Sequence, residues 1–178
     1  MSAPRQSVEL VLAPADDEAV RAVWRRLAEA GLPSLHDHRS ASNRPHLTLV
    51  TAPMVTPAQE ERLAALVAGR LPMETPWGEV ATFGHGPYAV VRLVRPTPEL
   101  LAFQHDLATV LDLATDPRDD VTSPARWAPH VSFAMRVPVK HRDAVVASVG
   151  DPGPHASTGL TWVSARRWNP VTRREWRL

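Results

Sequence analysis

The chain has 178 residues, of which 44% are hydrophobic and 22% are charged, and 20 Lys and Arg face 19 Asp and Glu. This composition is ordinary for a globular protein of one domain or of two small lobes. The near-zero net charge argues against a protein that coats long duplex nucleic acid, because such binding depends on neutralising phosphates.

Cysteine is absent, which excludes disulfides and thiolate metal sites. No apolar run approaches the roughly 18 residues of a membrane span. The first five residues also lack the apolar core of a signal peptide. We therefore expect a cytoplasmic protein with no membrane association, and we expect it to be a monomer.

The first part of the chain reads as a strand, a helix, a polar loop and a second strand. Residues 7–12 alternate and then run apolar, which predicts a strand. Acidic residues at 16–18 suit a helix N-terminus, apolar residues follow at helical spacing, and Gly31 ends the helix. A polar loop over 32–44 then leads into a strand over 46–51.

Two later helices share one start signal, a threonine followed by a proline. Thr56 with Pro57, and Thr97 with Pro98, place a capping hydroxyl before a proline at the first helical position. The remaining predicted elements are strands over 78–83 and 88–94, a turn at 84–87, a polar loop over 114–128, a strand over 129–137, a short helix over 140–149, and strands over 159–166 and 172–178.

One five-residue pattern occurs twice, as Pro-His-Leu-Thr-Leu over 45–49 and as Pro-His-Val-Ser-Phe over 129–133. In a strand, side chains alternate between faces. His46 and Thr48 therefore share one face, and His130 and Ser132 do the same in the second copy. Each copy offers an imidazole and a hydroxyl side by side, backed by two apolar groups. Two such copies facing each other would form an active site.

The surroundings of the two motifs are duplicated as well. Strand, helix, polar loop and motif strand occupy 8–51 and again 88–137, and a second helix and strand follow in both. This repeat implies a pseudo-twofold axis with the histidines near it. We predict a single α+β domain over 1–178, with two mainly antiparallel sheets around a central cleft and helices outside. Its interleaved lobes would span about 7–83 and about 88–178.

Two such histidine motifs in a duplicated chain of this size resemble the two-histidine (2H) phosphoesterase superfamily, and within it the 2′-5′ RNA ligase-like cyclic phosphodiesterases. The resemblance implies a bilobal α+β fold and hydrolysis of cyclic phosphodiesters, commonly 2′,3′-cyclic RNA ends opened to 2′-phosphates. Some members also join or cleave 2′-5′ linkages. By this likeness His46 and His130 would be the catalytic pair, and Thr48 and Ser132 would hold the phosphate. The ligand would be a small cyclic nucleotide or an RNA terminus.

The chain departs from the family pattern at one position. Many members carry a basic residue five positions after the second histidine, where this chain has Met135. Arg136 comes one residue later, on the opposite face if the strand is regular. A bulge would bring Arg136 round, or Arg44, Arg126 or Arg166 would replace it. The departure bears on the substrate preference rather than on the chemistry.

The chemistry needs two proton carriers and no cofactor. Opening a cyclic phosphate takes a proton from water and gives one to the leaving sugar oxygen, and two imidazoles with ordinary pKa values near about 6.5 can do both at neutral pH. Hydroxyls can donate to the non-bridging oxygens of the transition state. No metal is required. Trp127 and Trp168 are candidates to stack a base, and core or rim packing is the competing interpretation.

Four alternatives stay open. The enzyme could act on another cyclic nucleotide, such as an ADP-ribose cyclic phosphate or a signalling nucleotide, or it could be a 2′-5′ RNA ligase. A non-catalytic module for RNA ends or nucleotides would keep the cleft, although both histidine–hydroxyl pairs are intact. A metal-dependent hydrolase would use His36, Asp37 and His38, and their loop context favours a solvated loop instead.

His85, between two glycines, is expected to lie in a turn.

Overall fold

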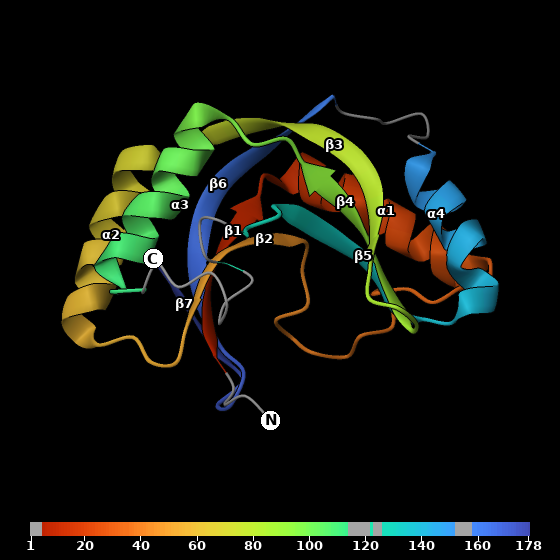
Figure 1. Ribbon diagram of the computed structural model, residues 1–178, viewed down its shortest axis with the longest axis horizontal. Helices are drawn as coiled ribbons and strands as arrows, with labels where there is room; N and C mark the ends of the chain where they lie inside the picture. Colours follow the sequence, from red (N-terminus) through yellow and green to blue (C-terminus); the bar gives the residue numbers. More distant parts are fainter. Residues whose placement is uncertain (1–4, 114–121, 123–125, 152–157) are drawn as a thin grey trace.

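The computed structural model describes residues 5–113, 122, 126–151 and 158–178 (Figure 1). Most of the predicted polar loop 114–128 therefore lies outside the described residues. The elements follow in the predicted order, and the α+β class with antiparallel strands is confirmed. They are β1 (Gln6–Leu12), α1 (Pro14–Glu29), β2 (His46–Ala52), α2 (Pro57–Arg70), β3 (Met73–Phe83), β4 (Tyr88–Val94), α3 (Pro98–Val110), β5 (His130–Val137), a 3-10 helix (Val139–His141), α4 (Arg142–Gly150), β6 (Gly159–Asn169) and β7 (Arg174–Arg177).

The seven strands are connected in the order β2-β1-β6-β3-β4-β5, with β7 paired to β6, and every pairing is antiparallel. The two predicted sheets are joined because β3 belongs to both. Its residues 73–76 pair with β6, and residues 77–83 pair with β4. Figure 1 shows the resulting sheet as an arch, with β3 and β6 crossing its top.

β3 starts five residues before the predicted strand 78–83. Pro76 and Gly78 argue against a regular central strand in the sequence. They lie where β3 leaves β6 and joins β4, so the partner change accommodates both residues. A Cβ at Gly78 would lie 3.0 Å from the Cβ of Leu93, which explains why a glycine suits this crossing point.

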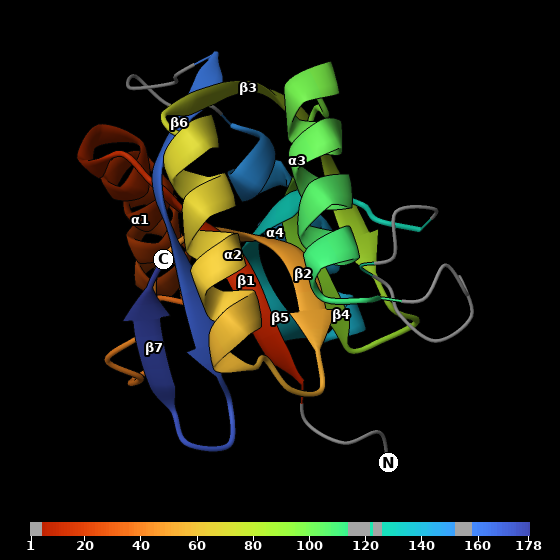
Figure 2. The ribbon, with the colours of Figure 1, turned by 90° about the vertical axis from the view of Figure 1, so that its left-hand side faces the viewer.

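The duplication is visible in the topology. The segments β1-α1-β2-α2-β3 and β4-α3-β5-α4-β6 repeat one order of elements, and their strands occupy mirrored places in the sheet. The helices cross between the halves, since α1 packs against β5 and α4, and α3 packs against β2 and α2. Figures 1 and 2 show these two helix pairs on opposite sides of the arch. Each motif strand is thus supported by a helix from the other half.

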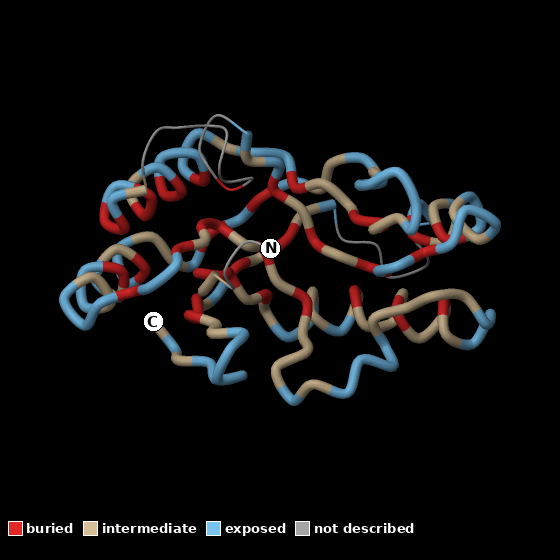
Figure 3. Tube along the Cα trace, turned by 60° about the horizontal axis from the view of Figure 1, so that its bottom comes forward, coloured by how far each residue is buried: buried red, intermediate tan, exposed pale blue. Residues whose placement is uncertain are grey.

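The helices bury the stripes that the sequence predicts. Val20, Trp24 and Leu27 are buried in α1, and α3 buries its face from Leu100 through Leu107. The helix start at Thr56 is a full capping box with Gln59, as the sequence indicated. Figure 3 shows buried residues along the strands and on the inward sides of the helices. Among the described helices, none combines the length and apolarity of a membrane span.

Candidate active site

The two motif strands are the two ends of the sheet path, and they come into contact with each other. On β2, Leu47 and Leu49 are fully buried while His46 and Thr48 are half-buried. β5 repeats this pattern, with half-buried His130 and Ser132. The predicted alternation is therefore present in both strands. The two apolar side chains of each strand anchor it in the core, and the polar pair lies on the opposite face of the strand.

Both histidines are held in the same tautomer by their own backbone. The Nδ1 atom of His46 lies 2.8 Å from the carbonyl oxygen of Arg44, and Nδ1 of His130 lies 2.7 Å from the carbonyl oxygen of Ala128. A carbonyl oxygen only accepts, so Nδ1 must carry the proton in each ring. Nε2 is therefore the ring nitrogen of each histidine that this backbone contact leaves unused.

The hydroxyls of Thr48 and Ser132 remain available. Within the part of the chain that the structure describes, neither side chain is engaged in a hydrogen bond. The carbonyl groups of the same two residues are instead used for support. Trp127 Nε1 donates to the Thr48 carbonyl at 2.9 Å, and Trp24 Nε1 donates to the Ser132 carbonyl at 3.2 Å. Each motif strand is thus held by an indole through the backbone of its hydroxyl-bearing residue, and the hydroxyl itself is not used for this contact.

His130 lies in apolar surroundings. The ring of Phe83 meets it edge-on with centroids 5.0 Å apart, and Leu93 is its partner across the sheet. Burial lowers the pKa of the His130 imidazole below its ordinary value, the hydrogen bond to the Ala128 carbonyl opposes this shift, and the charge of His46 adds to it. His130 is therefore the imidazole suited to be neutral at neutral pH.

This lowered pKa makes a prediction for stability. In the unfolded chain His130 takes up a proton near its ordinary pKa of about 6.5, whereas in the folded chain it does so only at a lower pH. As the pH falls from above 6.5 through the lower folded pKa, the free energy of unfolding therefore decreases. His130→Gln should remove this loss. Urea denaturation at pH 7.5 and pH 5 should show the wild type losing more free energy of unfolding than the variant. An equal loss in both proteins would contradict the shift.

A buried ion pair lies beside His46. Glu9 of β1 and Arg166 of β6 are cross-strand neighbours, and both are buried. The Nε and Nη2 atoms of Arg166 each lie 2.8 Å from Glu9 Oε2. The other carboxylate oxygen, Oε1, accepts from the Ser7 hydroxyl at 2.6 Å and lies 3.8 Å from His46 Nε2. When His46 carries a second proton, it forms an ion pair with Glu9.

The Glu9–Arg166 pair is part of a longer network of charged residues that also includes Glu175 of β7 and Arg44. Arg166 Nη1 donates to the Ser42 carbonyl and to the carboxylate of Glu175 on β7. Glu175 also pairs with Arg44, whose Nη2 lies 2.8 Å from Oε1. From the sequence, Arg166 is a possible replacement for the missing basic residue, or part of a nucleotide-facing edge or a solvated strand end over 166–168. Its burial shows that the solvated strand end is wrong, and the pairing with Glu9 was not predicted. No local signal in the sequence pairs Glu9 with Arg166, because the two residues are 157 positions apart.

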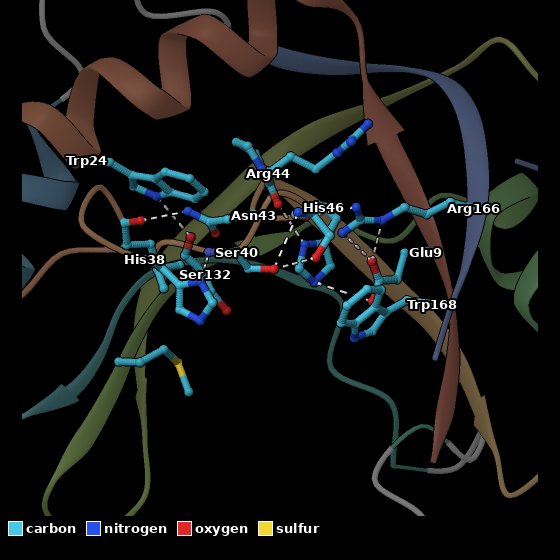
Figure 4. A pocket seen from close by; sticks show the side chains of 14 residues that line it. Glu9, Trp24, His38, Ser40, Asn43, Arg44, His46, Ser132, Arg166 and Trp168 are labelled. Atoms are coloured by element: carbon cyan, nitrogen blue, oxygen red, sulfur yellow. Dashed lines mark hydrogen bonds and ion pairs between the residues drawn. The ribbon is translucent and has the colours of Figure 1, made fainter. Parts of the chain in front are cut away.

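A pocket of about 350 Å³ opens beside His46, between the motif strands and the loop before β2. Figure 4 shows Glu9, Arg166 and Trp168 on one side of His46, with Trp24 and Asn43 on the other. Ser132 and Met135 line the same pocket, while His130 and Thr48 do not. The full lining is Glu9, Trp24, Leu35, His38, Ser40, Ser42, Asn43, Arg44, Pro45, His46, Ser132, Met135, Arg166 and Trp168.

The four predicted substrate-binding residues have different places. Arg44 lines the pocket, and Arg126 is exposed outside its lining. Trp127 is half-buried and donates to the Thr48 carbonyl, so it supports β2 instead of lining the pocket. Arg136 is exposed and also lies outside the lining. β5 does bulge, with two register shifts against β4 and a positive φ at Arg136, but Met135 is the residue that lines the pocket.

Of the other described histidines, His36, His38 and His85 lie in loops or turns, whereas His105 lies on α3 and His141 ends the 3-10 helix. His38 lines the pocket from the loop before β2, and its Nδ1 accepts from the Ser40 amide at 3.4 Å. His85 is exposed in the turn between β3 and β4, where Gly84 and Gly86 have positive φ. Over the described ranges, no three His, Cys, Asp or Glu side chains come together as a metal site would need.

Comparison with known proteins gives matches by family and by structure. The sequence pattern of the 2′-5′ RNA ligase superfamily matches residues 14–169. No curated protein matches the chain. Among solved structures, apo E. coli LigT is similar with a TM-score of 0.59 and 18% identity, over 98% of this chain and 94% of LigT. Kluyveromyces marxianus Usb1 has a TM-score of 0.59 and 12% identity over 99% of both chains, and a structure described only as a phosphoesterase has a TM-score of 0.54 and 18% identity over 98% and 95%.

At these identities the structural likeness establishes the fold, which is that of the two-histidine phosphoesterases. The family match covers most of the chain and includes both histidine motifs. This chain belongs to the 2′-5′ RNA ligase superfamily.

Proposed function

We propose that the chain is a metal-independent phosphodiesterase that opens 2′,3′-cyclic phosphate ends of RNA or of nucleotides to 2′-phosphates. The observation that carries the proposal is the pair of histidine–hydroxyl faces on two contacting strands, each with Nε2 presented and a hydroxyl available. Those groups are one base, one acid and two hydroxyls that can donate hydrogen bonds to the phosphate oxygens, which is the set that this reaction needs.

The roles follow from the surroundings of each histidine. In the proposed reaction His130 takes a proton from water, the water oxygen attacks phosphorus, and the bond from phosphorus to the 3′ oxygen breaks. His46 gives its proton to the departing 3′ oxygen. The lowered pKa of His130 supports its role as base. The carboxylate of Glu9, close to His46 Nε2, supports the role of His46 as acid.

The related structures bind ligands of the proposed kind. E. coli LigT has been crystallised with phosphate, with 3′-AMP, with ATP and with NADP+, and K. marxianus Usb1 with uridine monophosphate. A pocket of about 350 Å³ with Arg44 in its wall suits a nucleotide phosphate. A small cyclic nucleotide or RNA terminus is therefore the ligand that we propose. A cytoplasmic location and a monomeric state remain predictions.

The alternatives differ in substrate or in catalysis, so a substrate panel tests them. The panel is a 2′,3′-cyclic mononucleotide, an oligonucleotide with a cyclic phosphate end, a 3′,5′-cyclic nucleotide and an ADP-ribose cyclic phosphate. We expect turnover of the first two. Turnover of only the last two would move the substrate to another nucleotide. Binding without turnover of any would indicate a non-catalytic module. Joining of the cyclic-phosphate-ended oligonucleotide to a 5′-hydroxyl end, with a 2′-5′ linkage formed as the bond from phosphorus to the 3′ oxygen breaks, would indicate ligase activity.

Removal of one phosphate-holding hydroxyl should reduce turnover. Thr48→Val keeps the side-chain volume but removes the donor, and we expect kcat on a 2′,3′-cyclic nucleotide to fall roughly 10²-fold. Thr82→Val is the matched control, because Thr82 is an exposed threonine of β3 outside the site. The two variants are compared by steady-state kinetics. Unchanged turnover in Thr48→Val would remove Thr48 from the phosphate-holding role.

A further inference from the structure

The two halves of the site are unequal although the fold is duplicated. Across the sheet, Thr48 is paired with Glu9, and Glu9 is paired with Arg166. The equivalent positions in the other half start from Ser132, which is paired with Val91. Val91 is in turn paired with Ala81. A charged pair next to one histidine thus replaces an apolar pair next to the other.

The two oxygens of the Glu9 carboxylate have different neighbours. Oε2 is held by two nitrogen atoms of Arg166. Oε1 is held by the Ser7 hydroxyl and is the oxygen that lies 3.8 Å from His46 Nε2. Buried charges persist in proteins when they are paired and fully hydrogen-bonded. Glu9 is therefore a fixed negative charge beside the one nitrogen of His46 that its backbone contact leaves available.

The other charged groups near His46 are balanced among themselves. Arg166 is shared between Glu9 and Glu175, and Glu175 is shared between Arg166 and Arg44. His130 is an imidazole and adds no negative charge to these surroundings. Of these neighbours, Glu9 is the negative group within ion-pair distance of the His46 ring.

We propose that Glu9, fixed by Arg166 and Ser7, is a positioning residue that commits His46 to the acid role, so that the duplicated site works in one direction. The inference rests on the proposed function. Glu9 does not touch the reacting phosphate in this account. Its negative charge, 3.8 Å from Nε2, pairs with the protonated imidazole, while the Arg44 carbonyl on Nδ1 fixes the orientation of the ring.

The test is a set of double variants that asks whether Glu9 acts through His46. Glu9→Gln keeps the shape and removes the charge. The change in kcat that Glu9→Gln causes on a 2′,3′-cyclic nucleotide is measured in three backgrounds, which are the wild type, His46→Ala and His130→Ala. We expect a drop of roughly 10-fold in the wild type and in His130→Ala, with KM little changed, and no further drop in His46→Ala.

A structural role would give a different pattern. An equal drop in the His46→Ala background, or no drop in the wild type, would overturn the inference while leaving the proposed function intact. No turnover by the wild type would instead overturn the proposed function. Glu175→Gln is the matched control, because it also removes a carboxylate from Arg166. We expect the effect of Glu175→Gln to be the same in all three backgrounds.

A second variant covers the case in which Glu9→Gln does not fold. Ser7→Ala removes the hydroxyl that holds Oε1 and leaves the Glu9–Arg166 pair in place. It should show the same dependence on background with a smaller drop, roughly 3-fold. A drop that persists in His46→Ala would contradict the inference in the same way.

Discussion

His46→Ala and His130→Ala are each expected to lower kcat on a 2′,3′-cyclic phosphate by roughly 10²- to 10⁴-fold, because each removes one of the two proposed proton-transfer groups. Neither change should unfold the chain. Both rings are half-buried on the cleft face, while the apolar neighbours on the other face anchor the strands in the core. Steady-state kinetics on folded protein, verified by circular dichroism, measures the effect.

The matched control is His105→Ala on α3. His105 is exposed on the helix surface, so its loss should leave kcat within about 2-fold of the wild type. Residues that act as one unit lose activity non-additively. The double variant His46→Ala/His130→Ala should therefore be little slower than the slower single variant. Near-wild-type turnover in either single variant would refute a two-histidine mechanism.

Arg166→Met is expected to lower the free energy of unfolding by about 3–5 kcal/mol, because it leaves the Glu9 carboxylate buried without its cation. Arg166 and Glu9 are both almost fully buried, and they are joined by a hydrogen bond from Nε and an ion-pair contact from Nη2, each of 2.8 Å. Glu175 loses the same partner but remains near the surface, where water and Arg44 can satisfy it. Urea denaturation at pH 7 measures the change.

The origin of this loss can be checked with a second substitution. Replacing both charges, in Glu9→Met/Arg166→Met, should restore much of the stability, since no unpaired charge stays buried. Arg25→Met serves as the surface control, because its partner Glu18 is well exposed and the pair is worth less than about 1 kcal/mol. A double variant as unstable as Arg166→Met would mean that lost packing, not the unpaired charge, sets the cost.

Local sequence patterns predicted the parts of the fold that depend on local physics. The alternation around His46 and His130 placed the polar pairs on one face and the leucines, valine and phenylalanine on the other. The cap at Thr56 marked the start of α2 to the residue. These features are set by strand periodicity and by hydrogen bonds within a few residues, so they can be read from neighbours in the sequence.

The parts that were missed depend on contacts between distant residues. Glu9 and Arg166 are 157 positions apart, and nothing near either residue indicates the other. A single Glu on an alternating strand reads as a solvated face, and only the sheet order puts β6 beside β1. The bulges of β5 have the same origin. They depend on the register with β4, which decides that Met135, and not Arg136, lines the pocket.

The most direct test of the two-histidine account is the hydrolysis of a 2′,3′-cyclic nucleotide by the wild-type chain in excess chelator, with the product followed by ³¹P NMR. The account predicts full turnover to the 2′-phosphate, with the rate unchanged by the chelator and abolished in His130→Ala. Turnover that stops when the chelator is added, or that survives in His130→Ala, would contradict it.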